Sequence, residues 1–284
     1  MLNKNIVNFI GCESEYEDAD IVLFGVPFDS TTSYRPGTRF GPSAIRNESY
    51  GLETYSPYQD KEITDGQIFD SGDLELPLGD TQRVLESIEE RTNVILEDGK
   101  LPFMIGGEHL VTLGSVRAVH KKYPDLHIIH FDAHADLRED YLGVKLSHAC
   151  VIRRCWESLG DGRIHQFGIR SGDKEEFLWA REGHVKMQKF SFDGLSETIG
   201  KLKEKPVYFT IDLDVLDPSV FPGTGTPEAG GVSFMELFQA VLDVVKGCRV
   251  VGCDVNELSP GYDTSGVSTA VAGKLVRELL IAFS

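Results

Sequence analysis

The chain has 284 residues, 41% of them hydrophobic and 26% charged, and a formal net charge of −17. This composition suits a chain that buries a core and excludes a disordered one. Nucleic acid is excluded as a partner because its recognition needs a basic face, and no block of Lys or Arg occurs here. The length suits a single domain over residues 1–284, and the acidic balance suits a cationic partner.

Cysteine usage and apolar run length indicate the compartment. The five cysteines include no CxxC pair, which favours reduced thiols. No apolar run reaches the ~20 residues that a membrane-spanning helix needs, and no secretory leader pattern opens the sequence. We therefore expect a soluble, cytoplasmic protein with no membrane partner.

Short β-branched runs alternate with longer amphipathic stretches along the chain, a pattern typical of a parallel sheet with helices between its strands. We predict, in chain order, a strand at 21–25, a helix at 81–97, a strand at 102–105, a helix at 110–122, strands at 126–131 and 163–168, a helix at 174–181, strands at 185–189 and 207–211, a helix at 234–246, a strand at 249–253 and a helix at 268–283. The predicted fold class is α/β, a three-layer α/β/α sandwich with a mostly parallel central sheet.

Polar motifs follow four of the predicted strands. They are Gly-Gly-Glu-His at 106–109, Asp-Ala-His-Ala-Asp at 132–136, Asp-Leu-Asp at 212–214 and Asp-Val-Asn-Glu at 254–257. Ligands of a parallel sheet bind outside the carboxyl ends of its strands. The four motifs are therefore predicted to converge on one site.

The acids and histidines of these motifs form a candidate metal centre. Successive side chains of an extended segment alternate faces, so the ligands within 132–136 are predicted to share one face, as are those within 212–214. Four carboxylates and two imidazoles carry a formal charge of −4, which balances two divalent cations. Such ligands favour Mn²⁺, with zinc, cobalt and iron as alternatives. The predicted ligands are His109, Asp132, His134, Asp136, Asp212 and Asp214.

An isolated acid at a strand end is more often a turn former than a ligand. Several unpaired acids at neighbouring strand ends, however, would repel one another without a cation among them. This favours the metal centre over the structural interpretation.

Long stretches of the chain resemble the arginase and agmatinase family of ureohydrolases, and agmatinases most closely. The resemblance rests on residues 106–109, on 130–136 and on the run TIDLDVLDPSVFPGTGTPEAGG at 210–231. Residues 35–42 with 45–46 resemble the family's amino-terminal loop, and 254–262 resemble its last active-site strand. Two departures from the commoner family wording are Glu108 in place of Asp and Thr210 in place of Ser.

The resemblance implies two Mn²⁺ per chain and divides the ligands between them. One metal would be held by the residues His109, Asp132, Asp136 and Asp212. The other would be held by Asp132, His134, Asp212 and Asp214, so that Asp132 and Asp212 bridge.

The implied reaction is attack of a metal-bridging hydroxide on a guanidino carbon. Asp136 is predicted to take the hydroxide proton and pass it to the leaving amine. His148 resembles the family's histidine at the cleft mouth, with predicted roles in proton transfer and substrate binding. A structural histidine that caps a helix is the alternative. Glu257 matches the family residue that pairs with the guanidinium. His130 is predicted to orient a metal ligand rather than to bind the metal itself.

The loop at 137–146 favours agmatine as substrate, with putrescine and urea as products. It has none of the Ser, Thr or Asn side chains with which arginases bind the α-carboxylate and α-amine of their substrate. It resembles agmatinase loops. An acidic rim is the hypothesis for the amine of agmatine. Its candidates are Glu139, Asp140 and Glu228.

Other functions remain open at this level. Arg138 and Lys145 leave room for the acid-tailed substrate guanidinobutyrate, and arginine and formimidoylglutamate are further alternatives. A metal-dependent deacetylase is another enzyme alternative, and a catalytically silent regulatory homologue is the non-enzyme one. The resemblance also implies a homotrimer or homohexamer.

Overall fold

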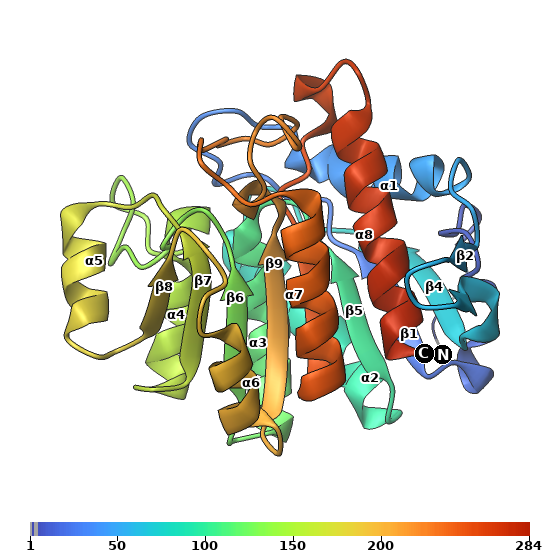
Figure 1. Cartoon of the computed structure of the whole chain (residues 1–284), viewed down its shortest axis with the longest axis horizontal. Helices are drawn as coiled ribbons and strands as arrows, with labels where there is room; N and C mark the ends of the chain where they lie inside the picture. The colour runs from blue at the N-terminus through green and yellow to red at the C-terminus, as the bar shows by residue number, and fades with distance from the viewer. Residues whose placement is uncertain (1, 3–4) are drawn as a thin grey trace.

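A parallel sheet of eight strands forms the centre of the part of the chain that the computed structural model describes, residue 2 and residues 5–284 (Figure 1). Neighbouring strands are parallel throughout, which confirms the predicted fold class. The strand order is β4 (Ile68–Asp73), β1 (Ile21–Gly25), β5 (Leu101–Ile105), β10 (Arg249–Asn256), β9 (Pro206–Asp212), β6 (His127–Phe131), β7 (Ile164–Ile169) and β8 (Lys186–Lys189).

Helices cover both faces of the sheet. One face carries α1 (Gly41–Ser49), α6 (Leu195–Leu202), α7 (Phe234–Gly247) and α8 (Val267–Phe283), and the last three lie in front of the sheet in Figure 1. The opposite face carries α2 (Thr81–Glu97), α3 (Thr112–Lys122), α4 (Val151–Leu159) and α5 (Lys174–Arg181). Because strand side chains alternate, Phe103 and the adjacent Met104 enter different hydrophobic clusters. The helices therefore bury both faces.

All seven predicted strands and all five predicted helices are present, with small shifts at their ends. The edge strand β4 and the short hairpin of β2 (Tyr55–Ser56) and β3 (Lys61–Glu62) were not predicted. The β4 sequence contains Asp, Ser and Gly, which are poor strand formers. Its buried Asp70 is stabilised by Arg46, whose Nε lies 2.8 Å from Asp70 Oδ2. A distant contact thus overrides the local preference.

The four strands that carry the polar motifs are adjacent, in the order β5, β10, β9, β6. Their carboxyl ends therefore open at one edge of the sheet, where the loops gather at the top of Figure 1. Short 3-10 turns follow two of them, η4 (His109–Val111) after β5 and η6 (Leu213–Val215) after β9. The predicted convergence of the motifs is confirmed.

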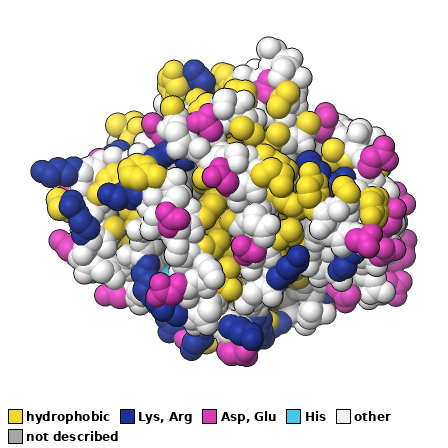
Figure 2. All heavy atoms as spheres, in the orientation of Figure 1, with side chains coloured by type: hydrophobic (Ala, Val, Ile, Leu, Met, Phe, Trp, Pro, Cys, Tyr) yellow, Lys and Arg dark blue, Asp and Glu magenta, His cyan; other side chains and the backbone are white. Residues whose placement is uncertain are grey.

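The surface shows how the acidic charge is distributed. On the face drawn in Figure 2, Lys and Arg are interspersed with Asp and Glu, and acidic side chains gather at the right-hand edge over β2 and β4. Within the described residues, no helix has the length and apolarity to cross a bilayer.

Gly107 is the point where the loop after β5 touches the backbone of Phe28. A Cβ there would lie 2.0 Å from the Phe28 carbonyl oxygen, and no rotamer change relieves a backbone clash. We expect Gly107→Ala to lower the free energy of unfolding by ~3 kcal/mol, measured by urea denaturation. Gly200→Ala is the matched control, because its Cβ would meet open space on a helix. Equal stabilities of the two variants would contradict the expectation.

Candidate metal centre

His109 is buried directly after β5 with its ring among carboxylates. Its Nδ1 lies 3.1 Å from Asp132 Oδ2, 3.2 Å from Asp136 Oδ2 and 3.4 Å from Asp212 Oδ2. None of these contacts has hydrogen-bond geometry, and Nδ1 has no hydrogen-bond partner among the described residues. The ends of β6 and β9 therefore direct three carboxylate oxygens at one ring nitrogen.

A hydrogen-bond chain behind His109 assigns its tautomer. Thr210 donates its hydroxyl proton to Asp254 Oδ1 at 2.6 Å, so its oxygen accepts the bond from His109 Nε2 at 2.9 Å. The proton of a neutral ring is then on Nε2, and Nδ1 directs a lone pair at the three carboxylates. Lone pair and carboxylates repel unless a cation lies between them. This donor arrangement fits a metal ion.

A second group of ligands adjoins the first. His134 Nδ1 lies 2.9 Å from Asp214 Oδ2 and 3.5 Å from Asp132 Oδ1. Asp214 Oδ2 is buried and has no hydrogen-bond partner within the described residues. Asp132 thus presents Oδ2 to His109 and Oδ1 to His134, so its carboxylate could contact a cation on either side.

His130 lies beside this cluster, and its nitrogens could form a metal triad with His109 and Asp132. Both of its nitrogens are already used. Nε2 lies 2.8 Å from Asp132 Oδ2, and Gln166 Nε2 lies 3.1 Å from Nδ1. His130 therefore orients the Asp132 carboxylate, in agreement with the supporting role expected from the sequence.

The prediction that strict strand alternation aligns the ligands is wrong in part. Strand β6 ends at Phe131, and Asp136 adopts a left-handed backbone with φ +53°. Its carbonyl accepts bonds of 3.1 Å from Ile152 N and Arg153 N at the start of α4. Asp214 lies in η6, and its N–H donates to Asp212 Oδ1 at 2.8 Å. Turns, rather than extended backbone, direct these side chains inward.

Burial and mutual repulsion disturb the titration of the cluster. Burial, and then the charge of Asp132, raise the pKa of Asp136 to about 7. Burial and the charge of Asp214 raise the pKa of Asp212 well above its usual value. Burial acts to lower the pKa of His109, but the surrounding carboxylates outweigh it and raise that pKa. A positive charge bound within the cluster would therefore reduce the repulsion between its carboxylates.

A cavity of about 130 Å³ opens onto the cluster, and Glu257 forms part of its wall. Glu257 is buried and adopts a left-handed backbone with φ +71°. Its Oε1 accepts a bond of 2.7 Å from His109 N, and no Lys or Arg of the described chain pairs with its carboxylate. Burial, and then the charge of Glu108, raise its pKa well above the ordinary value. A cationic ligand in the cavity would find an unpaired carboxylate.

His148 lines the same cavity. Burial lowers its pKa to about 4, so the ring is uncharged at neutral pH. Its Nε2 lies 3.4 Å from Ser33 Oγ, and its backbone N–H donates to Thr31 Oγ1 at 3.0 Å. It lies in a 3-10 turn before α4 and does not cap that helix with its side chain. The ring is held at the mouth by the amino-terminal loop.

Glu108 is a residue whose role the sequence interpretation missed. It is fully buried, and both carboxylate oxygens accept bonds from the loop at Thr31 and Thr32. The Thr31 hydroxyl donates to Glu108 and accepts from His148, so Glu108 holds His148 through Thr31. The signal was present in the sequence, because Glu108 departs from the commoner Asp.

The predicted acidic rim does not line the cavity. Glu228 is not among its described lining residues, and its backbone carbonyl accepts a bond of 2.8 Å from Arg170. Glu139 pairs with Lys145 at 2.9 Å, and Asp140 Oδ1 accepts from Gly143 N. The structure thus does not bring these acids to the candidate centre.

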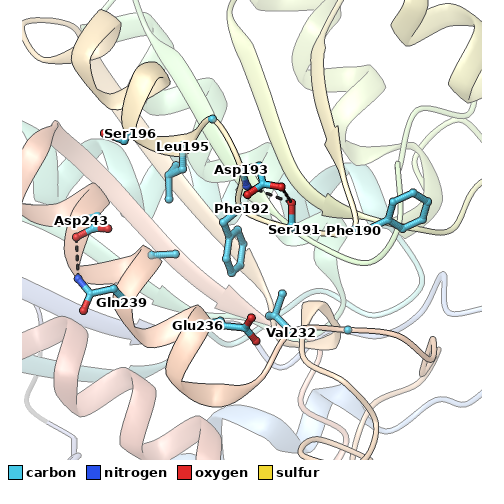
Figure 3. A pocket seen from close by; sticks show the side chains of 13 residues that line it. Phe190, Ser191, Phe192, Asp193, Leu195, Ser196, Val232, Glu236, Gln239 and Asp243 are labelled. Carbon is cyan, nitrogen blue, oxygen red and sulfur yellow. Dashed lines mark hydrogen bonds between the residues drawn. The ribbon is translucent and has the colours of Figure 1, made fainter.

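A second hollow, of about 540 Å³, lies between the end of β8, α6 and α7 (Figure 3). None of its described lining residues belongs to the candidate centre. Its acids already have local partners, since Ser191 donates to Asp193 and Gln239 donates to Asp243, both at 2.8 Å. We therefore place the functional site in the smaller cavity.

Comparison with known proteins identifies the family. The family model described as Arginase family matches residues 19–282. The chain belongs to the arginase family. It is 50% identical to the agmatinase of Bacillus subtilis over 97% of this chain and 96% of that relative. It is 34% identical to a guanidinobutyrase of Pseudomonas aeruginosa, over 94% and 87%. The structure of an agmatine ureohydrolase of Thermoplasma volcanium matches with a TM-score of 0.89 at 34% identity, over 98% and 94%.

Thr31→Val tests the connection between Glu108 and His148. The valine keeps the shape of threonine but removes a donor to a buried carboxylate and the acceptor of His148 N. We expect the free energy of unfolding to fall by ~2 kcal/mol, measured by urea denaturation, and the imidazole NMR signals of His148 to shift. Thr32→Val is the control, because Thr32 makes one bond of 3.2 Å to Glu108 and none to His148. An unchanged His148 signal in Thr31→Val would contradict the claim that Glu108 holds His148 through Thr31.

Proposed function

We propose that this member of the arginase family is an agmatinase, which hydrolyses agmatine to putrescine and urea with two Mn²⁺ per chain. The observation that carries the proposal is His109 Nδ1 facing three carboxylates, with Glu257, which no Lys or Arg of the described chain pairs with, in the same cavity. The 50% sequence identity to the agmatinase of Bacillus subtilis supports agmatine as the substrate. A homotrimer or homohexamer and a cytoplasmic location stay parts of the proposal.

We assign the six candidate ligands to two cations. The contacts of His109 support one cation among His109, Asp132, Asp136 and Asp212. The contacts of His134 with Asp132 and Asp214 support a second cation among these three residues, and the family resemblance adds Asp212. Oxygen-rich ligation with two imidazoles and no thiolate favours manganese. A silent homologue would have no need to keep this arrangement.

Two divalent cations held by these residues would make water a strong nucleophile at neutral pH. In the reaction, the water oxygen bonds to the guanidino carbon, the bond from that carbon to the alkyl nitrogen breaks, and the leaving amine takes a proton. Glu257 pairs with the guanidinium and fixes its plane, since its carboxylate has no other cation within the described chain. Asp136 carries the proton to the leaving amine, and the uncharged His148 exchanges protons with solvent at the mouth.

Urea release by the Mn²⁺-loaded protein tests the function. We expect turnover of agmatine in preference to arginine, guanidinobutyrate, guanidinopropionate and formimidoylglutamate. Asp132→Asn serves as the blank, because it removes one charge from the carboxylate that faces both histidines. Preferential turnover of another compound would keep the mechanism and replace the substrate, whereas no turnover of any of them would refute the proposal.

Metal content tests the ligand assignment. Inductively coupled plasma mass spectrometry is expected to find two metal ions per chain in the wild type, one in His134→Ala and almost none in Asp132→Asn. Removing the metal with a chelator is expected to lower the midpoint of thermal unfolding, because four buried carboxylates then repel one another. His184→Gln is the control, since this histidine pairs with Asp161 away from the site. A wild type that binds one ion would contradict the assignment.

A further inference from the structure

We propose that Asp173 and Glu176, the capping box of α5, set the substrate preference of the site by cancelling the charge of Arg138. The inference rests on the proposed function and deepens it. It states that the cancelled charge makes the cavity accept guanidino substrates with an amine tail and discriminate against those with a carboxylate tail.

Arg138 is the fixed positive charge nearest to the path of the substrate tail. The guanidino end of a substrate lies against Glu257 and the candidate ligands, so the tail extends along the remaining wall of the cavity. Among the described residues that form this cavity, Arg138 is the only Lys or Arg. An unpaired guanidinium there would attract a carboxylate tail and repel an ammonium tail.

Two carboxylates and an aromatic ring hold Arg138. Its Nη1 lies 2.8 Å from Asp173 Oδ2, and its Nε lies 3.6 Å from Glu176 Oε2. Its guanidinium carbon lies 5.0 Å from the centroid of the Tyr141 ring. One guanidinium and two carboxylates sum to a charge of −1, so Arg138, which forms part of the cavity wall, presents no net positive charge to a cationic tail.

The same two carboxylates begin helix α5. Asp173 Oδ1 accepts from Glu176 N at 3.0 Å, and Glu176 Oε2 accepts from Asp173 N at 2.7 Å. Glu176 Oε1 also accepts a bond of 2.8 Å from Leu137 N, the residue before Arg138. The capping box therefore fixes its own carboxylates against the loop that carries Arg138. These contacts hold the charge pair in one geometry.

Asp173→Asn separates the two roles of this residue. Asn caps a helix about as well as Asp, so α5 keeps its cap while Arg138 loses its closest counter-charge. The quantity to measure is the ratio of kcat/KM for agmatine to kcat/KM for 4-guanidinobutyrate. We expect the ratio to fall about tenfold, through a higher KM for agmatine and a lower KM for 4-guanidinobutyrate.

Two further variants complete the design. Arg138→Gln leaves both carboxylates without their cation, so the same ratio is expected to rise. Glu175→Gln makes the same charge change as Asp173→Asn in the same helical turn, but the exposed Glu175 is not one of the two carboxylates that pair with Arg138, so its ratio is expected to stay within about twofold of the wild type. Thermal unfolding midpoints are measured to check that all three variants fold.

Product binding gives a readout that does not depend on turnover. The rise in thermal unfolding midpoint caused by putrescine is expected to shrink in Asp173→Asn, and that caused by 4-aminobutyrate to grow. Parallel loss of both substrates at an unchanged ratio would show a purely structural role and overturn the inference, while the proposed function would stand. A wild type that hydrolyses neither substrate would refute the proposed function and this inference with it.

Discussion

The structure of the site depends on the mutual repulsion of carboxylates buried at adjacent strand ends. Hydrogen bonds stabilise only part of this charge: His134 N donates to Asp132, Ala133 N donates to Asp214, and Asp214 N donates to Asp212. Asp214 Oδ2, which faces His134, receives no hydrogen bond within the described chain, and Asp132 Oδ2, which faces His109, is bonded by His130 alone. Cations would complete the arrangement, so the proposed metal ions would stabilise the sheet edge as well as bind to it.

Backbone strain lies at the same edge. Asp136 and Glu257 both adopt left-handed backbones, which cost free energy in residues other than glycine. Each is fixed by neighbouring backbone: the Asp136 carbonyl accepts from the start of α4, and Glu257 N donates to Gly107 O at 2.9 Å. The close approach of Gly107 to Phe28 holds that loop in turn. The rigid sheet thus maintains two strained residues whose side chains both face the cavity.

The sequence was sufficient to predict the strands, the convergence of four motifs and the six residues that the structure brings together, because strand ends of a parallel sheet follow a topological rule. It did not predict β4, whose Asp70 depends on Arg46, or the turn at Asp136, which depends on α4. The role of Glu108 also needed the fold, because its partners Thr31 and Thr32 lie far away in the sequence. Local patterns cannot reveal such distant contacts.

The structure changes the interpretation of the positive charge of Arg138. In the sequence it is a free cation in a substrate loop, and it favours a carboxylate tail. In the fold, Asp173 and Glu176 reach it from the first turn of α5, and the sign of the local charge reverses. Because the two side chains also cap the helix, removing them weakens α5 as well as the charge balance, whereas Asp173→Asn changes the charge and keeps the cap. The start of α5 and the proposed preference for an amine-tailed substrate therefore depend on the same two side chains, and an uncharged cap such as Asn at position 173 would separate the two.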